Sequence, residues 1–331
     1  MERRSLLRGG VALVGATVLA VTTSVASAAA TTITTVVKIT GINWFNRMDE
    51  GGKKFGADNP SVTVNQIGPA SADSALQVQM VESLIAKRVT AICVVPLSPE
   101  TLEPVLKRAM SRGIVVVGHE GSNLQNVDYD VEAFDNKSYG EHLMKELATR
   151  MGGEGKYVIF VGHLTARTHN EWADAAVAYQ KANYPKMEEA VSRVESDEDQ
   201  QTAYAKTKEV LRAHPDIKGI QGSSAVDVPG AALAIEEASL TGKIAVVGTS
   251  LPSVSGKFIQ SGSIGLIAFW DPALAGYAMN KVALMKIQGK PVTDGMDLGV
   301  KGYEKIRLVG KVIYGQAWAD VTKDNLTEYN F

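Results

Sequence analysis

The chain has 331 residues, enough for about two domains of ordinary size, and 45% of them are hydrophobic, as in soluble globular proteins. A net charge of −2, with no basic cluster after the first residues, gives no electrostatic reason to expect nucleic acid or acidic lipid as a partner. The single cysteine, Cys93, excludes an internal disulfide, and its place in an apolar run suits a small buried hydrophobe better than a reactive thiolate.

The first 28 residues have the pattern of an export signal. Arg3 and Arg4 precede the apolar stretch Gly9–Val25, and Ala26-Ser27-Ala28 supplies a small-residue cleavage site. We therefore expect a signal peptide at 1–28 and a mature protein in the periplasm or cell envelope. A membrane anchor is the alternative, but the many Ala, Gly and Thr residues make the segment weakly hydrophobic and favour cleavage. The paired arginines also suit twin-arginine export.

After a flexible start at 29–35, short apolar runs alternate with helical periodicity. The first strand is expected at Val36–Ile39. A helix follows, because Phe45, Met48 and Phe55 are spaced for one helix face. The further elements expected in this half are a strand at 62–67, a helix around 76–85, a strand at 91–95, a helix at 99–112 capped by Ser98, and a strand near 127–131.

A second block of the same style begins at Asp135-Asn136. Its expected helices are at 143–151, 172–184 and 202–213, and its expected strands include 156–161, 191–194 and 264–268. The chain then continues with a long helix at Pro272–Gln288, a glycine-rich connection, a strand at Ile306–Ile313 and a final polar stretch.

Two stretches repeat one βαβ design. Thr90–Ser122 and Lys218–Pro252 each run from an apolar strand through a polar loop and an amphipathic helix to a second strand and a second polar loop. Such units build parallel sheets, and ligands bind beyond the carboxyl ends of their strands. Two of these sheets facing each other would form a cleft.

We therefore predict an α/β protein of two doubly wound parallel-sheet lobes joined by a multi-strand hinge. The N-terminal lobe takes residues 36–134 plus 271–309, and the C-terminal lobe takes 135–270 plus 310–331. Because the chain crosses between the lobes more than once, hinged closure around a ligand is expected.

The loops at the strand ends collect side chains that suit a ligand rich in hydroxyl groups. Carboxylates and amides accept hydrogen bonds from hydroxyls, lysine and arginine donate to them, and aromatic faces cover C–H surfaces. Positive and negative groups roughly balance, so we expect an uncharged ligand. The expected ligand-binding residues are Lys38, Asn43, Trp44, Phe45, Glu120, Arg167, His169, Asn170, Ser223, Ser224, Asp227, Ser250, Trp270 and Asp271.

Some of these positions have a purely structural alternative. Asp227 stands just before the helix that begins near Pro229, and Asp271 stands before Pro272, so each could cap a helix. Trp172 follows the apolar face of its helix and could belong to the core instead of a ligand wall.

Enzymatic chemistry is not expected. The five histidines form no HExxH arrangement, and the chain has no phosphate loop, dinucleotide glycine motif or nucleophile elbow. We therefore expect no catalytic residue, no metal site and no cofactor.

Five short motifs occur in a fixed order along the chain. They are Gly41–Phe45, Val95–Pro99 with the following Leu106–Gly113, Asn170–Trp172, Val247–Ser250 and the ending Asn325–Phe331. Together they resemble the type I periplasmic sugar-binding proteins of bacterial ABC transporters over essentially the whole mature chain. Within that family the chain is most similar to autoinducer-2 and rhamnose receptors, with ribose-binding proteins further off.

The resemblance implies roles for individual residues. Lys38 takes the position of the ligand lysine of the autoinducer-2 receptors, and Glu120 that of their first-domain aspartate. Their adjacent aspartate and glutamine fall on Thr168 and His169, and their proline and alanine backbone contacts fall on Ser223 and Ala225. Only the lysine and the alanine are retained, which argues against autoinducer-2 itself.

Compared with ribose-binding proteins, Arg167 matches the second-domain arginine. Ser224, Ser250 and Trp270 stand where that pattern has asparagine, aspartate and glutamine. The bulky ring of Trp270 narrows the cleft, so a sugar or sugar alcohol of four to six carbons fits better than a disaccharide.

The function implied is a monomeric solute-binding protein that delivers a small neutral sugar or polyol to an ABC transporter permease without chemistry. An autoinducer-2-like or sugar sensor acting through a membrane receptor is the alternative, because uptake and sensing use the same closure. A transcription regulator of the same fold would need a DNA-binding segment where the leader stands.

Overall fold

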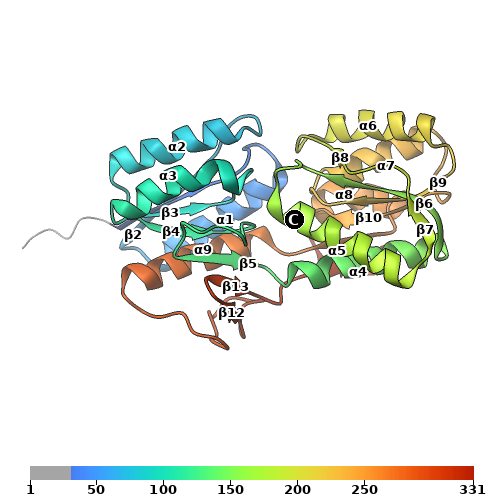
Figure 1. Cartoon of the computed structure of the whole chain (residues 1–331). Helices are drawn as coiled ribbons and strands as arrows, with labels where there is room; N and C mark the ends of the chain where they lie inside the picture. Colours follow the sequence, from blue (N-terminus) through green and yellow to red (C-terminus); the bar gives the residue numbers. More distant parts are fainter. Residues whose placement is uncertain (1–30) are drawn as a thin grey trace, which may run out of the picture. The chain divides into compact units, whose positions relative to one another are not determined.

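The computed structural model describes residues 31–331, and the expected signal peptide at 1–28 lies outside the described residues. Within residues 31–331 the strands form two separate sheets (Figure 1). The first has the order β12-β13-β5-β4-β3-β1-β2. The second has the order β14-β11-β10-β9-β6-β7, with β8 paired to β6.

Five parallel strands make up most of the first sheet. They are β1 (Thr31–Val36), β2 (Val62–Ile67), β3 (Ala91–Val94), β4 (Val115–Gly118) and β5 (Tyr129–Glu132). Runs such as β3 are buried on both faces and therefore need helices on both sides. The helices α1 (Asn43–Asp58) and α9 (Pro272–Ile287) pack together on one face, and α2 (Ser74–Lys87) and α3 (Pro99–Ser111) on the other.

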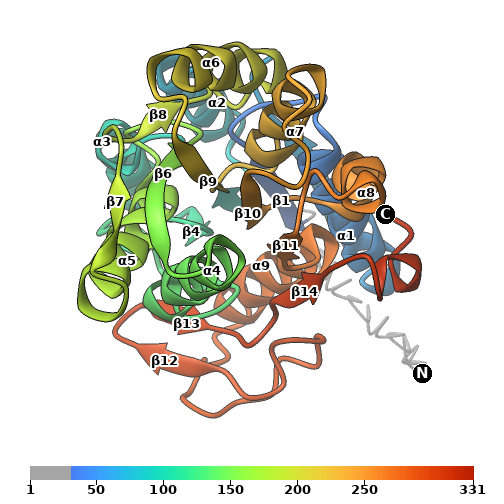
Figure 2. The same ribbon diagram turned by 90° about the vertical axis from the view of Figure 1, so that its right-hand side faces the viewer.

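The second sheet is covered in the same way. Its strands are β6 (Glu154–Val161), β7 (Lys186–Glu189), β8 (Val194–Glu195), β9 (Ile217–Gly222), β10 (Ala245–Thr249) and β11 (Leu266–Phe269). Figure 2 shows α4 (Asn136–Met151) and α5 (Arg167–Asn183) on one side of it, and α6 (Gln200–Ala213) and α7 (Asp227–Glu237) on the other. The short helix α8 (Pro252–Ser261) follows β10.

In the described residues the chain passes between the two sheets three times, at 133–135, at 270–271 and at 315–318. Aromatic residues pack where these crossings meet. The ring of Phe134 stacks on Tyr139 with centroids 4.2 Å apart, and Trp270 and Trp318 meet Phe134 edge-on. This arrangement confirms the prediction of two doubly wound lobes joined by a multi-strand hinge.

The first strand begins earlier than the sequence suggested. Thr31–Val36 forms β1, so residues 31–35 are not a flexible start. Threonine is β-branched and suits a strand, and β1 pairs with β2 on one side and β3 on the other.

The tail also differs from expectation. Instead of one strand at 306–313, β12 (Arg307–Val309) and β13 (Val312–Tyr314) form an antiparallel hairpin that turns at Gly310. Because β13 pairs with β5, it belongs to the first sheet, and the change of lobe falls at 315–318 rather than at 310. Only then does β14 (Ala319–Val321) join β11, before the short helix η1 (Leu326–Glu328).

Candidate ligand-binding site

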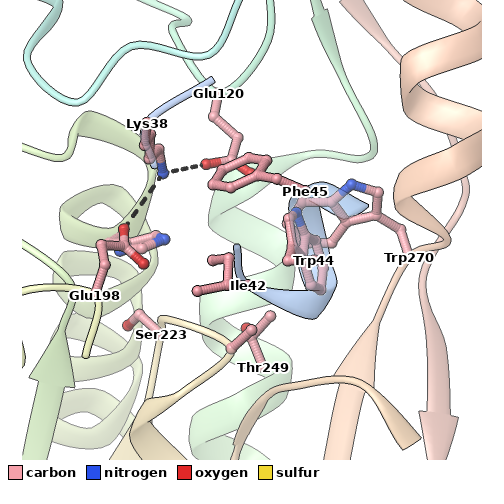
Figure 3. A pocket seen from close by; sticks show the side chains of 11 residues that line it. Lys38, Ile42, Trp44, Phe45, Glu120, Glu198, Ser223, Thr249 and Trp270 are labelled. Carbon is pink, nitrogen blue, oxygen red and sulfur yellow. Dashed lines mark hydrogen bonds and ion pairs between the residues drawn. The ribbon is translucent and has the colours of Figure 1, made fainter. Parts of the chain in front are cut away.

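A small cavity lies where loops from both sheets meet (Figure 3). Lys38 and Glu120 follow strands β1 and β4 of the first sheet, and Ser223 follows β9 of the second. These are the carboxyl ends of parallel strands, the usual place for ligands in such sheets. The cavity is lined by Lys38, Ile42, Trp44, Phe45, Glu120, His169, Glu198, Ser223, Ala225, Thr249 and Trp270.

The ammonium group of Lys38 lies between two carboxylates. It donates to Glu120 Oε2 at 2.5 Å, and Glu198 Oε1, from the other lobe, lies 3.8 Å from its Nζ. Figure 3 shows the lysine between the two acids. All three side chains are buried, at 5% exposure or less. Burying an unpaired charge is costly, so these three side chains stabilise one another as a group.

The loop conformations aim both acids at the lysine. Glu120 has φ +58° and Glu198 has φ +54°, in the left-handed region that residues other than glycine rarely adopt. Such strain persists only where the surroundings hold it, and it occurs often at functional sites.

The protonation states follow from these surroundings. Burial alone would lower the pKa of Lys38, but attraction by Glu120 and Glu198 outweighs it and holds the pKa above its usual value. Burial would raise the pKa of Glu198, but the charge of Lys38 and the hydrogen bond from Ser224 outweigh it and hold the pKa below its usual value, so that carboxylate is ionised. Burial and the charge of Lys38 lower the pKa of His169 to about 3, so its ring is neutral.

The tautomer of His169 is set by the backbone. The amide of Gly162 donates to His169 Nδ1 at 3.2 Å, so the ring proton sits on Nε2. The neutral imidazole therefore offers one N–H donor.

Aromatic rings form the apolar part of the wall. Trp44 and Phe45 come from the first turn of α1, and Trp270 comes from the second crossing between the lobes. The rings of Trp44 and Trp270 meet edge-on with centroids 4.6 Å apart. The cavity thus combines ionised polar groups with flat apolar faces, the combination that binds a compact molecule with both hydroxyl and C–H surface.

The cavity volume is about 20 Å³, which is room for about one water molecule. A larger guest therefore needs the lobes to separate or the side chains to rearrange. The lobes can separate because only the three crossing segments join them.

Seven of the residues expected from the sequence meet at this cavity: Lys38, Trp44, Phe45, Glu120, His169, Ser223 and Trp270. The other seven lie elsewhere. Asn43 is exposed, with its amide 3.4 Å from the hydroxyl of Ser253, and the half-exposed Arg167 pairs with Glu171 on its own helix. Asn170 donates to backbone carbonyls around residues 163–166.

Four of these seven have supporting roles. Asp227 accepts from the backbone amides of Ser223 and Ser224, and the hydroxyl of Ser224 donates to Glu198 at 2.5 Å. Ser250 donates to the carbonyl of Ala225. Asp271 caps α9 and binds Arg47, so the capping interpretation describes it.

Trp172 belongs to the core. It is 1% exposed, and its indole N–H donates to Asn136 at 2.9 Å. Cys93 is likewise fully buried, and burial raises the pKa of its thiol to about 12.

Glu198 is the principal lining residue that the sequence did not indicate. It lies between β8 and α6 in a polar stretch, four residues after the expected strand at 191–194, which has only two apolar residues and so gives a weak strand-end signal. Ile42 and Thr249 lie within the motifs Gly41–Phe45 and Val247–Ser250, but their side chains gave no chemical reason to expect ligand contact. Among residues 31–331, no group of His, Cys, Asp and Glu side chains could hold a metal ion, and no helix has the length and apolar character needed to cross a bilayer.

Two parallel-sheet lobes, three crossings and a buried polar cavity between strand ends define a hinged solute-binding protein. Residues 33–291 match the periplasmic binding protein domain, and the chain belongs to that family. Members of the family bind solutes for transporters and do not transform them, so the chain is not an enzyme.

Individual proteins show the same relationship. The D-allose-binding periplasmic protein of Escherichia coli is 29% identical over 217 residues, covering 63% of this chain and 69% of the relative. A solute-binding protein of Clostridium phytofermentas with bound L-rhamnose superposes with a TM-score of 0.84 at 22% identity, covering 91% and 98% of the two chains. One from Burkholderia graminis in complex with D-arabinose has a TM-score of 0.77 at 26% identity, with coverage of 91% and 98%.

Proposed function

We propose that this protein captures a small neutral sugar or sugar alcohol of four to six carbons outside the cytoplasm and presents it, chemically unchanged, to an ABC transporter permease. The observation that carries this proposal is the buried group of Lys38, Glu120 and Glu198 at the carboxyl ends of strands in two hinged lobes. Each lobe contributes a carboxylate, so a ligand bound by both favours the closed arrangement.

The chemistry of the cavity suits hydroxyl groups. A hydroxyl donates and accepts at once, and here it finds ionised acceptors, an ammonium donor and the N–H of His169. The rings of Trp44, Phe45 and Trp270 can cover the C–H faces of a sugar. Even a monosaccharide needs the lobes to separate before it enters, and the ring of Trp270 in the wall leaves less room for a disaccharide.

The comparisons support the ligand class. The E. coli relative is named for D-allose, and the B. graminis structure holds D-arabinose, both small neutral sugars. Export through a signal peptide at 1–28 and action as a monomer complete the proposal. The basic, apolar and small-residue order of the leader supports the first of these.

A thermal-shift screen of the mature chain tests the proposal. The panel holds D-allose, D-ribose, D-arabinose, L-rhamnose, xylitol and the disaccharide maltose. A ligand that binds only the native state raises Tm, so at least one neutral monosaccharide or alditol should raise it while maltose should not. Solution scattering should then show a more compact particle with that ligand. A Tm that no neutral polyol changes would overturn the ligand class.

A further inference from the structure

Glu198 reaches the cavity on an unusual piece of backbone. Both Asp197 and Glu198 are in the left-handed region, with φ of +57° and +54°. Two successive residues other than glycine in this region are rare. Such backbone persists only where the surrounding structure holds it, and it is often found at functional sites. The segment belongs to the second lobe, so it brings a carboxylate to the cavity opposite Glu120 of the first lobe.

The space for this carboxylate is made by Gly162, just beyond the end of β6. A Cβ atom there would lie 2.4 Å from Glu198 Oε1. On the other side the hydroxyl of Ser224 donates to Oε2 at 2.5 Å and holds the group in place. Oε1 has no hydrogen-bond donor although it is buried. An ionised oxygen without a donor is costly in the interior, so Oε1 is arranged for a donor from outside the chain.

The gap between Oε1 and Lys38 defines that donor. The two atoms are 3.8 Å apart, too far for a direct hydrogen bond. A hydroxyl oxygen at ordinary hydrogen-bond distance from both fits beside this gap, and it would accept from the ammonium and donate to the carboxylate. An ether oxygen cannot donate, and a ligand carboxylate can neither donate nor tolerate the neighbouring negative charges.

We propose that Glu198 determines specificity by accepting a hydrogen bond from one ligand hydroxyl, which itself accepts from Lys38, and that Glu198 and Glu120 together reject sugar acids. This inference rests on the proposed function and narrows its substrate class to ligands with a free hydroxyl at that point. The charges around the cavity support it, because two carboxylates face one ammonium while His169 is neutral. A ligand carboxylate would add a third negative charge at a buried site.

The test compares matched neutral and acidic ligands by calorimetry. The pairs are D-ribose with D-ribonate, D-allose with D-allonate, and xylitol with D-xylonate. The wild type should bind the neutral member of its preferred pair at least 10-fold more tightly. Glu198→Gln keeps the size of the side chain and removes the charge, so neutral binding should weaken about 10-fold and the neutral-to-acid ratio of Kd values should change by 10-fold or more.

Glu195→Gln is the matched control. Glu195 lies three residues away, outside the cavity, where its carboxylate accepts from the amide of Leu164. The substitution Glu195→Gln removes the same charge from the same segment but outside the cavity, so the neutral-to-acid selectivity should stay within about 2-fold of the wild type. If Glu198→Gln keeps wild-type affinity and selectivity, the role of Glu198 is overturned while the proposed function stands. If the wild type binds no neutral member of any pair, the proposed function fails and this inference fails with it.

Discussion

The hydroxyl of Ser122 donates to the carboxylate of Glu171 across the gap between the lobes, with O–O distances of 2.9 and 3.1 Å. Ser122 follows Glu120 by two residues in the loop after β4, and Glu171 lies near the start of α5. Glu171 also accepts from Asn136, the first residue after the first crossing, and from Arg167. One carboxylate therefore joins the ligand loop of the first lobe to the hinge end of the second.

Ser122→Ala should weaken sugar binding although Ser122 does not line the cavity. The bond it removes exists only when the lobes are together, so the loss should appear as faster dissociation, by about 3- to 10-fold, with little change in the association rate. Stopped-flow fluorescence measures both rates. Ser122→Thr keeps a hydroxyl at this position, so its dissociation rate should stay close to that of the wild type. Ser111→Ala removes a hydroxyl that donates within its own helix and is the control; equal dissociation rates in the two alanine variants would show that the contact does not hold the lobes.

Arg167→Ala should have little effect on affinity, less than about 3-fold, because the half-exposed guanidinium pairs with Glu171 on the surface. Glu120→Ala should weaken binding by about 10-fold or more, since it removes an acceptor and leaves the ammonium of Lys38 buried without its nearest partner. Calorimetry with the preferred sugar compares the two variants. An Arg167→Ala loss as large as that of Glu120→Ala would mean that Arg167 contacts the ligand.

Much of this arrangement could be predicted from the sequence because it follows from strand ends. Lys38, Glu120 and Ser223 each stand within two residues of the end of a strand, and parallel strands bring such positions to one edge of their sheet. The alternation of apolar runs with helical periodicity likewise indicates both lobes. These features are local in the sequence.

The features that the sequence did not predict depend on which way a side chain points and on pairing between strands far apart in the chain. Arg167 and His169 are two residues apart at the start of α5, so their side chains point about 200° apart around the helix, and only one can face the cavity. The sequence pattern predicts ligand contact for both Arg167 and His169, because it does not show which side of the helix faces the cavity. Glu198 stands in a polar loop, and its position depends on space left by Gly162 and a donor from Ser224. The place of β13 depends on pairing with β5, about 180 residues away.

Stability should fall as the pH rises toward 8 because of two buried acids on β5. Burial raises the pKa of Asp130 to about 7, and burial and repulsion by Asp130 raise that of Glu132 well above its usual value. Glu120 and Glu171 add to the repulsion. The native state therefore keeps protons that the unfolded chain loses, so this stability is present below the ordinary carboxyl pKa and is lost as the pH rises through about 7.

Glu132→Gln should accordingly flatten the decline between pH 5 and pH 8 and stabilise the protein at pH 8, by about 1–3 kcal/mol. Urea unfolding at the two pH values measures this. His142, whose pKa is raised by its bond to Asp320, contributes a decline in the same direction, so the difference between variant and wild type is the informative quantity. Glu154→Gln on the exposed start of β6 should leave the slope unchanged. The same slope in both variants would contradict the assignment to Glu132.

Gly162→Ala should impair binding through Glu198. The added Cβ would meet Glu198 Oε1 at 2.4 Å and His169 Cε1 at 3.1 Å, so the carboxylate must move from its place opposite Lys38. Neutral sugar affinity should fall by about 10-fold or more, whereas Gly256→Ala in α8, where the new methyl meets only Leu326 at ordinary contact distance, should leave affinity unchanged.

A double-mutant cycle identifies the cause of that loss. If Gly162 matters because it makes room for the carboxylate, Gly162→Ala should cost much less in the Glu198→Gln background than in the wild type, because the negative charge that the added methyl displaces is already gone. Calorimetry on the four proteins gives the coupling. Losses that simply add would show that Gly162 supports the site independently of Glu198, since two changes acting on the same oxygen cannot each cost their full amount.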